Sequence, residues 1–175
     1  MNWLEIGQGK RDMMKHIINN YKNVGYYCIE PNKRVCNFLS QVCKNVKNEF
    51  APPIFYKGNC FGVVYLSNIL EHITNFRSDV FMIKEIKRVL KPQGIIIING
   101  PDLIHWKELF WDYDYTHNFP LSKRRLETLL DDNDFKIKDF SYFTGPFSGF
   151  AATVFSSAVH LLIIFISNFQ IYPLS

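Results

Sequence analysis

The sequence predicts an α/β fold in which helices cover both faces of a mostly parallel, doubly wound sheet. Short runs rich in β-branched and aromatic residues alternate with stretches of helical period, as in successive βαβ units. The run from Ile95 to Ile98 contains isoleucine alone, which is typical of a central strand buried on both faces. A chain of 175 residues, 47% of them hydrophobic, is long enough for one domain with a substantial core.

Two strands and two helices are expected in the N-terminal part. The first strand is predicted from Trp3 to Ile6 and the second from Val24 to Ile29, after which Pro31 cannot continue a central ladder. Between these strands, five apolar residues recur at helical spacing and should face the sheet: Met13, Met14, Ile17, Ile18 and Tyr21. A second amphipathic helix is predicted from Val35 to Val46.

The middle of the chain begins irregularly. Two prolines and a Gly-Asn pair break residues 48–60, so any third strand there is short. A strand is predicted from Phe61 to Leu66. Ser67 and Asn68 at its end offer N-cap chemistry to a helix that should begin at Ile69.

The second half continues the alternation. A helix is expected from Asp79 to Lys91, stopping at the turn Pro92-Gln93-Gly94 before the strand of isoleucines. Ser122 can cap a later leucine-rich helix. Residues 135–143 alternate apolar and polar side chains with period two, as in an edge or antiparallel strand.

Charge and cysteine usage narrow the function classes. A net charge of +4, from 20 Lys and Arg against 16 Asp and Glu, is too small for a protein that binds nucleic acid mainly through its phosphates. No nucleic-acid partner is therefore expected. The four cysteines form no CxxC pair, so neither a metal site nor a disulfide framework is predicted. We expect reduced thiols in a cytoplasmic protein.

A glycine loop follows the first strand almost at once. Gly7 and Gly9 permit a tight turn whose backbone can approach a ligand at the carboxyl end of a parallel strand. A dinucleotide-binding fold would place a third glycine where Asp12 stands. A carboxylate there would repel a pyrophosphate, which makes NAD or FAD a weaker alternative.

An acid closes the second strand. The carboxylate of Glu30 can accept hydrogen bonds from both hydroxyls of a ribose. With the glycine loop, Glu30, "FGVVYLSNILEHI" and "IKEIKRVLKPQGIIIING" in this order, the chain resembles the class I S-adenosylmethionine-dependent methyltransferases. It is most similar to their small-molecule, type 11-like branch, and the resemblance covers about residues 3 to 143. It implies a Rossmann-like sheet.

The resemblance also implies a binding site for S-adenosylmethionine. Seven residues match the family's cofactor motifs: Glu5, Gly7, Gly9, Glu30, Leu66, Ser67 and Asn68. In this pattern the glycine loop cradles the methionine part of the cofactor and Glu30 holds the ribose. The segment from Leu66 to Asn68 lines the side of the methionine and sulfonium.

The acceptor side is expected beyond the strand of isoleucines. Asn99 and Pro101 match the rim at which the acceptor enters in the family, and Asp102 and His105 follow directly. The alternative for the last two is an ordinary solvated loop. The aromatic run "HWKELFWDYDY" can stack on a sugar or planar ring, or form a partly buried helix face.

Two histidines are candidate general bases, because methyl transfer to a hydroxyl releases a proton. His72 follows Glu71 near the end of the Phe61–Leu66 strand. A lone histidine beside an apolar strand is often structural, so packing or capping is the alternative there. His117 lies in the loop "DYTHNFP", which is rich in aromatic and polar groups, and the sequence leaves open whether it contacts substrate.

The chain also departs from the family pattern. Members generally carry one or two helices before the first strand, whereas only Met1 and Asn2 precede it here, which suggests N-terminal truncation. Arg11 replaces a small residue, Gly62 replaces an aspartate, and no acid is found where adenine is usually read. A degenerate, non-catalytic binding or scaffold domain is therefore the alternative to an active methyltransferase.

The C-terminal segment, residues 144–175, differs from the predicted methyltransferase domain of residues 1–143. Its residues 147–171 carry no Lys, Arg, Asp or Glu and are long enough to span a bilayer. They could contact the inner face of a membrane, supply a final core strand or a homodimer surface, or represent a frameshifted end. The expected acceptor is accordingly a small molecule, a glycan or a lipid-linked precursor.

Overall fold

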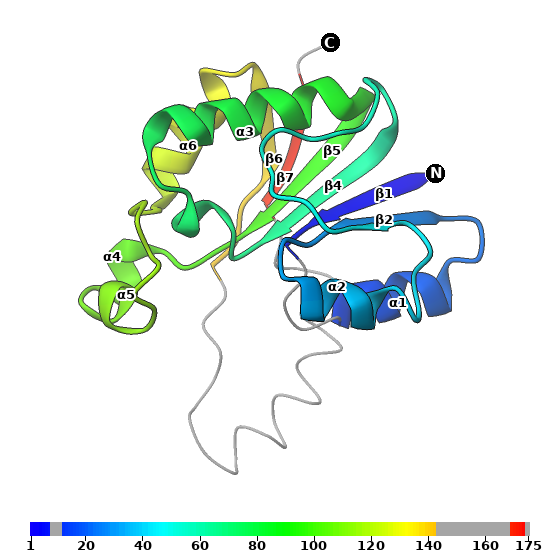
Figure 1. Cartoon of the computed structure of the whole chain (residues 1–175). Coiled ribbons are helices and arrows are strands. Elements are labelled where there is room, and N and C mark those ends of the chain that lie inside the picture. The colour runs from blue at the N-terminus through cyan, green and yellow to red at the C-terminus, as the bar shows by residue number, and fades with distance from the viewer. Residues whose placement is uncertain (8–11, 143–168, 174–175) are drawn as a thin grey trace.

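The computed structural model describes residues 1–7, 12–142 and 169–173 (Figure 1). In this part of the chain, seven strands form one sheet in the order β3-β2-β1-β4-β5-β7-β6. Their bounds are β1 Asn2–Ile6, β2 Gly25–Ile29, β3 Val46–Lys47, β4 Phe61–Ser67, β5 Leu90–Asn99, β6 Phe135–Asp139 and β7 Phe169–Pro173. The first five strands pair in parallel, and β7 pairs antiparallel with both β5 and β6. The predicted mostly parallel, doubly wound sheet is confirmed.

Helices cover both faces of the sheet, with α1 and α2 on one face and α3 and α6 on the other (Figure 1). The helices are α1 Asp12–Asn20, α2 Lys33–Leu39, α3 Phe76–Val89, α4 Leu103–Trp106, α5 Leu109–Asp112 and α6 Lys123–Asp131, with a 3₁₀ turn, η1, at Leu70–His72. The short helices α4 and α5 lie beyond the carboxyl end of β5 (Figure 1).

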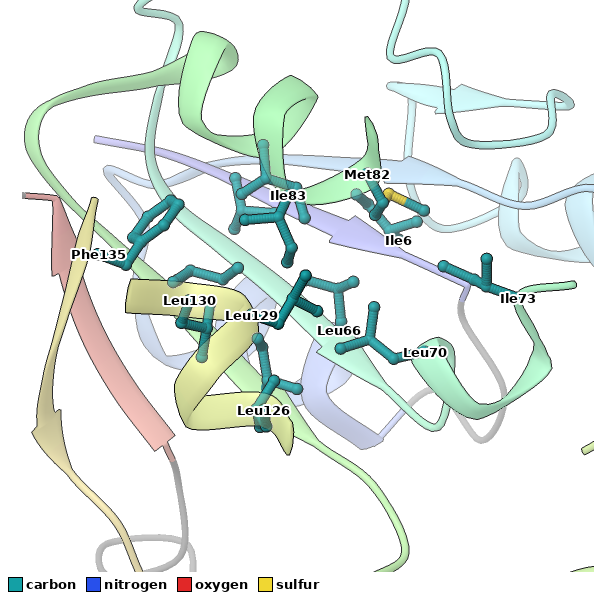
Figure 2. Close-up of a cluster of buried hydrophobic side chains, with 14 of the residues drawn as sticks. Ile6, Leu66, Leu70, Ile73, Met82, Ile83, Leu126, Leu129, Leu130 and Phe135 are labelled. Carbon is teal, nitrogen blue, oxygen red and sulfur yellow. The ribbon is translucent and has the colours of Figure 1, made fainter. Parts of the chain in front are cut away.

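The larger core lies between the sheet and helices α3 and α6 (Figure 2). Leu66 of β4, Ile83 of α3 and Leu130 of α6 are all fully buried there. Each such side chain contributes roughly 1.5–3 kcal/mol relative to an exposed one. On β5, Ile96 and Ile98 face this core while Ile97 packs on the opposite face, as expected for a central strand.

Fewer apolar residues of the α1 region are buried against the sheet than the helical periodicity predicts. Met14 and Ile17 are buried against β2, but Ile18 and Tyr21 are 38% and 50% exposed. The prediction that all five apolar residues face the sheet is wrong for these two. Tyr21 lies beyond the last residue of α1, where the chain turns toward β2.

Helix α2 ends at Leu39, seven residues before the predicted end at Val46. The reason is strand pairing, because Val46 is aligned with Cys28 of β2 in the short parallel strand β3. Asn45 supports this edge by accepting a hydrogen bond from the Cys28 N–H at 3.0 Å. A backbone ladder therefore overrides an apolar period that would otherwise extend the helix, and Val42 is left 57% exposed.

The connection from β4 to α3 also differs from the prediction. The segment forms the single 3₁₀ turn η1, without a capping bond from Ser67 or Asn68. Asn68 instead adopts a left-handed backbone with φ 53° and donates its N–H to Asn99 O at 2.8 Å. Helix α3 begins only after Asn75, whose side chain accepts from the Ser78 N–H at 3.0 Å.

Helix α3 leads directly into β5 without the predicted turn. The strand includes Pro92, Gln93 and Gly94, and Gln93 has φ 62°. Later, Ser122 caps α6 as predicted, and β6 is an edge strand as its alternation indicates.

The C-terminal segment contributes strand β7, which lies between β5 and β6. Residues 147–168 of the predicted apolar stretch lie outside the described residues. Within the described part of the chain, no helix has both the length and the hydrophobicity needed to cross a membrane. Cys28, Cys36, Cys43 and Cys60 are free thiols.

Candidate active site

A cleft of about 1050 Å³ lies at the carboxyl ends of β1, β2 and β4. Five of the predicted cofactor residues line it: Glu5, Gly7, Glu30, Ser67 and Asn68. They come from three strands that are far apart in sequence, and parallel pairing brings their ends together. Leu66 packs its side chain into the core instead, and Gly9 lies outside the described residues.

Gly7 forms the bend at the end of β1. It has φ 70° and donates its N–H to Ile29 O at 2.9 Å. A Cβ atom at this position would lie 2.0 Å from the Cδ1 atom of Ile69. The position therefore requires glycine both for its left-handed backbone and for the close approach of Ile69, which directly precedes η1.

Glu30 is held at the end of β2. It is 7% exposed, and its Oε1 atom accepts the Asn32 N–H at 2.7 Å. The side chain of Asn48 fixes the backbone here by donating to Glu30 O at 2.9 Å. These contacts place a carboxylate on the cleft wall, where it can accept hydrogen bonds from a diol.

Cys28 lies beneath these acids and is not a candidate nucleophile. Burial raises the pKa of its thiol, and the charges of Glu5 and Glu30 raise it further. A protonated, fully buried thiol has little nucleophilic character.

The ends of β4 and β5 form the next part of the cleft wall. Ser67 and Asn99 are paired in the sheet, and the Asn99 Nδ2 atom donates to Ser67 Oγ at 3.2 Å. Asn99 also belongs to the wall of a second cavity, so it lies at the boundary of the two.

The second cavity has a volume of about 630 Å³ and extends over α4, the start of α6 and residues 140–142, which follow β6. The four predicted acceptor residues line it: Asn99, Pro101, Asp102 and His105. Its walls are mostly aromatic and aliphatic: Trp106, Leu109, Tyr113, Leu121, Leu126, Phe140 and Tyr142. The sequence left stacking or a partly buried helix face open for Trp106 and Tyr113. It did not indicate Phe140 or Tyr142, because only tertiary contacts bring the residues after β6 to this cavity.

Asp102 supplies a charge at the rim of this second cavity. Burial opposes ionisation, but hydrogen bonds from the Ile104 N–H, the Tyr142 hydroxyl and the Lys123 N–H hold the pKa of Asp102 below its ordinary value. His105 Nδ1 lies 3.6 Å from the same carboxylate. The Asp102 carboxylate can accept a hydrogen bond from a polar substituent of an otherwise apolar ligand, and the His105 ring can donate one to it.

The two predicted bases lie side by side, with ring centroids 5.0 Å apart. His72 lines the first cleft, whereas His117 is buried behind it and is 8% exposed. Glu71 adjoins both histidines. Sequence reasoning did not select it, because only the fold brings it next to His117. Burial raises the pKa of the Glu71 carboxyl to about 7, and the charge of Asp114 adds to this effect.

The family model for the methyltransferase domain matches residues 1–139 of the chain. The chain belongs to this methyltransferase family. S-adenosylmethionine is accordingly the cofactor that this methyltransferase is expected to use. A search of curated protein sequences finds no match.

Solved structures agree with this fold. A S-adenosylmethionine-dependent methyltransferase from Archaeoglobus fulgidus superposes with a TM-score of 0.68 at 17% identity, covering 98% of this chain and 85% of its own. A second one, from Methanosarcina mazei, has a TM-score of 0.66 at 18% identity and covers 80% of this chain and 82% of its own. The YcgJ protein of Bacillus subtilis gives a TM-score of 0.70 at 14% identity, covering 89% of this chain and 70% of its own. At these identities the likeness concerns the methyltransferase fold.

The residues present in this methyltransferase fit the expected cofactor. The first cleft offers a glycine bend at Gly7, which brings backbone close to a ligand, and a buried carboxylate at Glu30, which suits ribose hydroxyls. Both lie where open α/β sheets bind ligands, at the carboxyl ends of the strands.

Proposed function

We propose that this methyltransferase transfers a methyl group to an oxygen atom on a hydroxylated ring, carried by a small molecule, a glycan or a lipid-linked precursor. The observation that carries the proposal is that two chemically different cavities adjoin each other and share Asn99 in their walls. One cavity has the acids and the glycine bend of a nucleoside site, and the other has an aromatic wall.

The first cleft is proposed to hold the methyl donor. When bound, S-adenosylmethionine supplies an electrophilic methyl carbon on its sulfonium. Gly7 would contact its amino-acid part through the backbone, and Glu30 would accept hydrogen bonds from the ribose hydroxyls. Ser67 and Asn99, linked by a hydrogen bond of 3.2 Å, border the side that faces the second cavity.

The second cavity is proposed to hold the acceptor. Trp106, Tyr113 and Tyr142 present aromatic surfaces on which a sugar or a planar ring can stack. Asp102 and His105 can bind a hydroxyl of that ring. Catalysis here is mainly positioning, because aligning donor carbon and acceptor oxygen removes a large entropic part of the barrier.

His72 and His117 are proposed to assist loss of the hydroxyl proton. His72 lines the donor cleft, and its ring lies 5.0 Å from that of His117. For a lipid-linked acceptor, residues 147–168 are proposed to contact the membrane surface, because residues 169–171 of the predicted apolar stretch belong to β7 in the sheet. Residues 1–143 are proposed to act as the methyltransferase domain.

A pair of tryptophan variants tests the acceptor site. Trp106 lines the second cavity, whereas Trp111 is 47% exposed and does not line it. A panel of phenols, sugars and polyprenyl-linked sugars would be screened for formation of S-adenosylhomocysteine. With the best acceptor, Trp106→Ala should raise KM by about tenfold, the loss of roughly 1.4 kcal/mol of stacking and burial.

Trp111→Ala is the matched control and should leave KM unchanged. Equal effects of the two substitutions, or no turnover with any hydroxylated acceptor in the panel, would argue against this assignment.

A further inference from the structure

Three side chains that could bind a metal ion meet behind the donor cleft. Glu71, His72 and His117 each offer one ligand atom, and these atoms lie within 4.8 Å of one another. Two of the residues are buried and the third is half-buried. The cluster comes from two segments, η1 and the loop after α5, that are more than forty residues apart in the sequence.

The hydrogen bonds of His117 determine which of its nitrogens is available. Its Nδ1 atom contacts the carbonyl oxygen of Phe110, and a carbonyl can only accept. Nδ1 therefore carries the proton, and Nε2 has the lone pair. This arrangement is the usual one for a metal-binding histidine, whose other ring nitrogen donates to a carbonyl or a carboxylate.

A chain of hydrogen bonds fixes His72 in the same tautomer. The Thr116 hydroxyl donates to the Asp114 carboxylate, with Oγ1 and Oδ1 2.6 Å apart, so it must accept from its other partner. That partner is His72 Nδ1, at 2.8 Å. His72 therefore also presents Nε2 as the atom with a lone pair.

Glu71 completes the set with an oxygen ligand. Its side chain is 1% exposed, and neither carboxylate oxygen has a hydrogen-bond partner among the described residues. The neighbouring N–H groups of Asn118 and Phe119 bond its backbone carbonyl rather than its side chain. A buried carboxylate without donors costs free energy unless a cation or a proton compensates it.

We propose that Glu71, His72 and His117 bind a divalent transition-metal ion of the zinc class. Two imidazole nitrogens and one carboxylate oxygen suit Zn²⁺, Fe²⁺ or Co²⁺ better than Mg²⁺ or Ca²⁺, which prefer sets of oxygen ligands. Metal–ligand bonds of about 2.0–2.2 Å require the three atoms to approach to roughly 3–3.5 Å, so the cluster contracts on binding.

The position of the cluster gives the ion a role, which rests on the function proposed above. His72 lines the donor cleft, and a Cβ atom on Gly100, which lines the acceptor cavity, would lie 3.4 Å from Glu71 Oε2. Three protein ligands leave a position open for an acceptor hydroxyl, whose pKa the ion lowers. With the ion bound, His72 and His117 act as its ligands and not as proton acceptors, so they assist loss of the hydroxyl proton only through the ion, and the proton passes to water. The oxygen lone pair forms the O–CH₃ bond, and the S–CH₃ electron pair stays on sulfur as a neutral thioether.

Cobalt binding to the full chain tests the site without donor or acceptor present. After treatment with a chelator, the protein would be titrated with Co²⁺ and followed by its visible absorption, then challenged with Zn²⁺. We expect one equivalent of Co²⁺ to bind with nitrogen- and oxygen-type bands and to be displaced by Zn²⁺ but not by Mg²⁺. Glu71→Gln and His117→Gln should each weaken binding at least tenfold, with His16→Gln as the control.

Thr116→Val keeps the proposal testable if the two ligand variants fail to fold by circular dichroism. It keeps all three ligands, removes the acceptor of His72 Nδ1 together with the hydroxyl's bond to Asp114, and should weaken Co²⁺ binding severalfold. The proposal would be overturned if the wild-type protein bound no Co²⁺, or if the ligand variants or Thr116→Val bound it as tightly as the control. Absorption bands typical of thiolate-to-cobalt charge transfer would also overturn it, because the cysteines would then be the ligands. A separate titration with S-adenosylmethionine shows whether the donor site works when the metal site does not.

Discussion

Gly7 illustrates how a single residue sets the shape of the donor cleft. Its φ of 70° is one obstacle to any larger side chain, and the 2.0 Å that would separate a Cβ atom from Ile69 Cδ1 is another. The left-handed backbone costs a non-glycine residue about 1–2 kcal/mol. The cost of the clash depends on Ile69 alone. The two contributions can therefore be separated experimentally.

We expect Gly7→Ala to lower the free energy of unfolding by about 1–3 kcal/mol. In an Ile69→Ala background, which lacks both Cδ1 and Cγ1, the same substitution should cost only the backbone part. Urea unfolding of the four proteins in this double-mutant cycle measures the difference. Identical costs in both backgrounds would show that the contact with Ile69 is irrelevant.

Asp79 makes stability depend on pH. It is fully buried on α3, and burial raises the pKa of its carboxyl to about 7, with Arg125 opposing this only in part. The folded protein therefore binds more protons than the unfolded chain between the ordinary pKa of 3.8 and about 7. Its contribution to stability is present at low pH and is lost as pH rises through this window.

For Asp79→Asn we expect a flatter dependence of the unfolding free energy on pH, with a difference from wild type of about 2–4 kcal/mol across the window. Urea unfolding at several values between about pH 4 and pH 8 checks this. Parallel curves for the two proteins would mean that Asp79 is already solvated in the folded state.

Sequence reasoning identified Gly7 and Glu30 because each follows a predicted strand and parallel strands share an edge, whereas Glu5 was selected through the resemblance to the methyltransferases. It did not select Glu71. An acid beside a histidine carries no special signal in the sequence, and its significance depends on burial next to His117, from a distant loop.

At the scale of elements, α2 connects helix stability to the cleft. Asn32 Oδ1 accepts the N–H groups of Arg34 and Val35 at 3.0 and 3.3 Å, while its own N–H donates to Glu30. The side chain of Asn32 forms the cap, whereas its backbone N–H forms the contact with Glu30. A substitution can therefore remove the first and keep the second.

Asn32→Ala should lower the free energy of unfolding by about 1 kcal/mol while leaving affinity for S-adenosylmethionine within about twofold. Thermal unfolding and calorimetry measure the two quantities, and Asn32→Asp is the control because it retains a capping oxygen. A large loss of affinity in Asn32→Ala would mean that α2 positions Glu30 through more than this one N–H.

The elements that sequence reasoning misjudged share a physical cause. The end of α2 is decided by pairing of Val46 with β2, and the turn η1 by the bond from the Asn68 N–H to Asn99 O. Both are tertiary hydrogen bonds, which local periodicity and capping signals do not contain. Long, strongly patterned elements such as α6 and the isoleucine part of β5 were predicted well because their burial repeats along the chain.

At the scale of the whole molecule, the sheet brings two cavities into contact at one edge. Strands β1, β2 and β4 supply the donor cleft, and the acceptor cavity is lined by α4, α6 and residues 140–142, which follow β6. The parallel pairing of the first five strands follows from the βαβ pattern. The insertion of β7 between β5 and β6 could not be derived in this way, because its predicted stretch carries no clear alternation.

The central claim is that the cleft between Gly7 and Glu30 binds S-adenosylmethionine, and titration calorimetry with this ligand tests it most directly. The full chain should bind with a micromolar Kd, and Glu30→Gln should weaken binding at least about tenfold because charge-assisted hydrogen bonds are lost. Glu108→Gln, at an exposed acid outside the cleft lining, should bind like wild type. No heat of binding at millimolar ligand, or wild-type affinity in Glu30→Gln, would contradict the account.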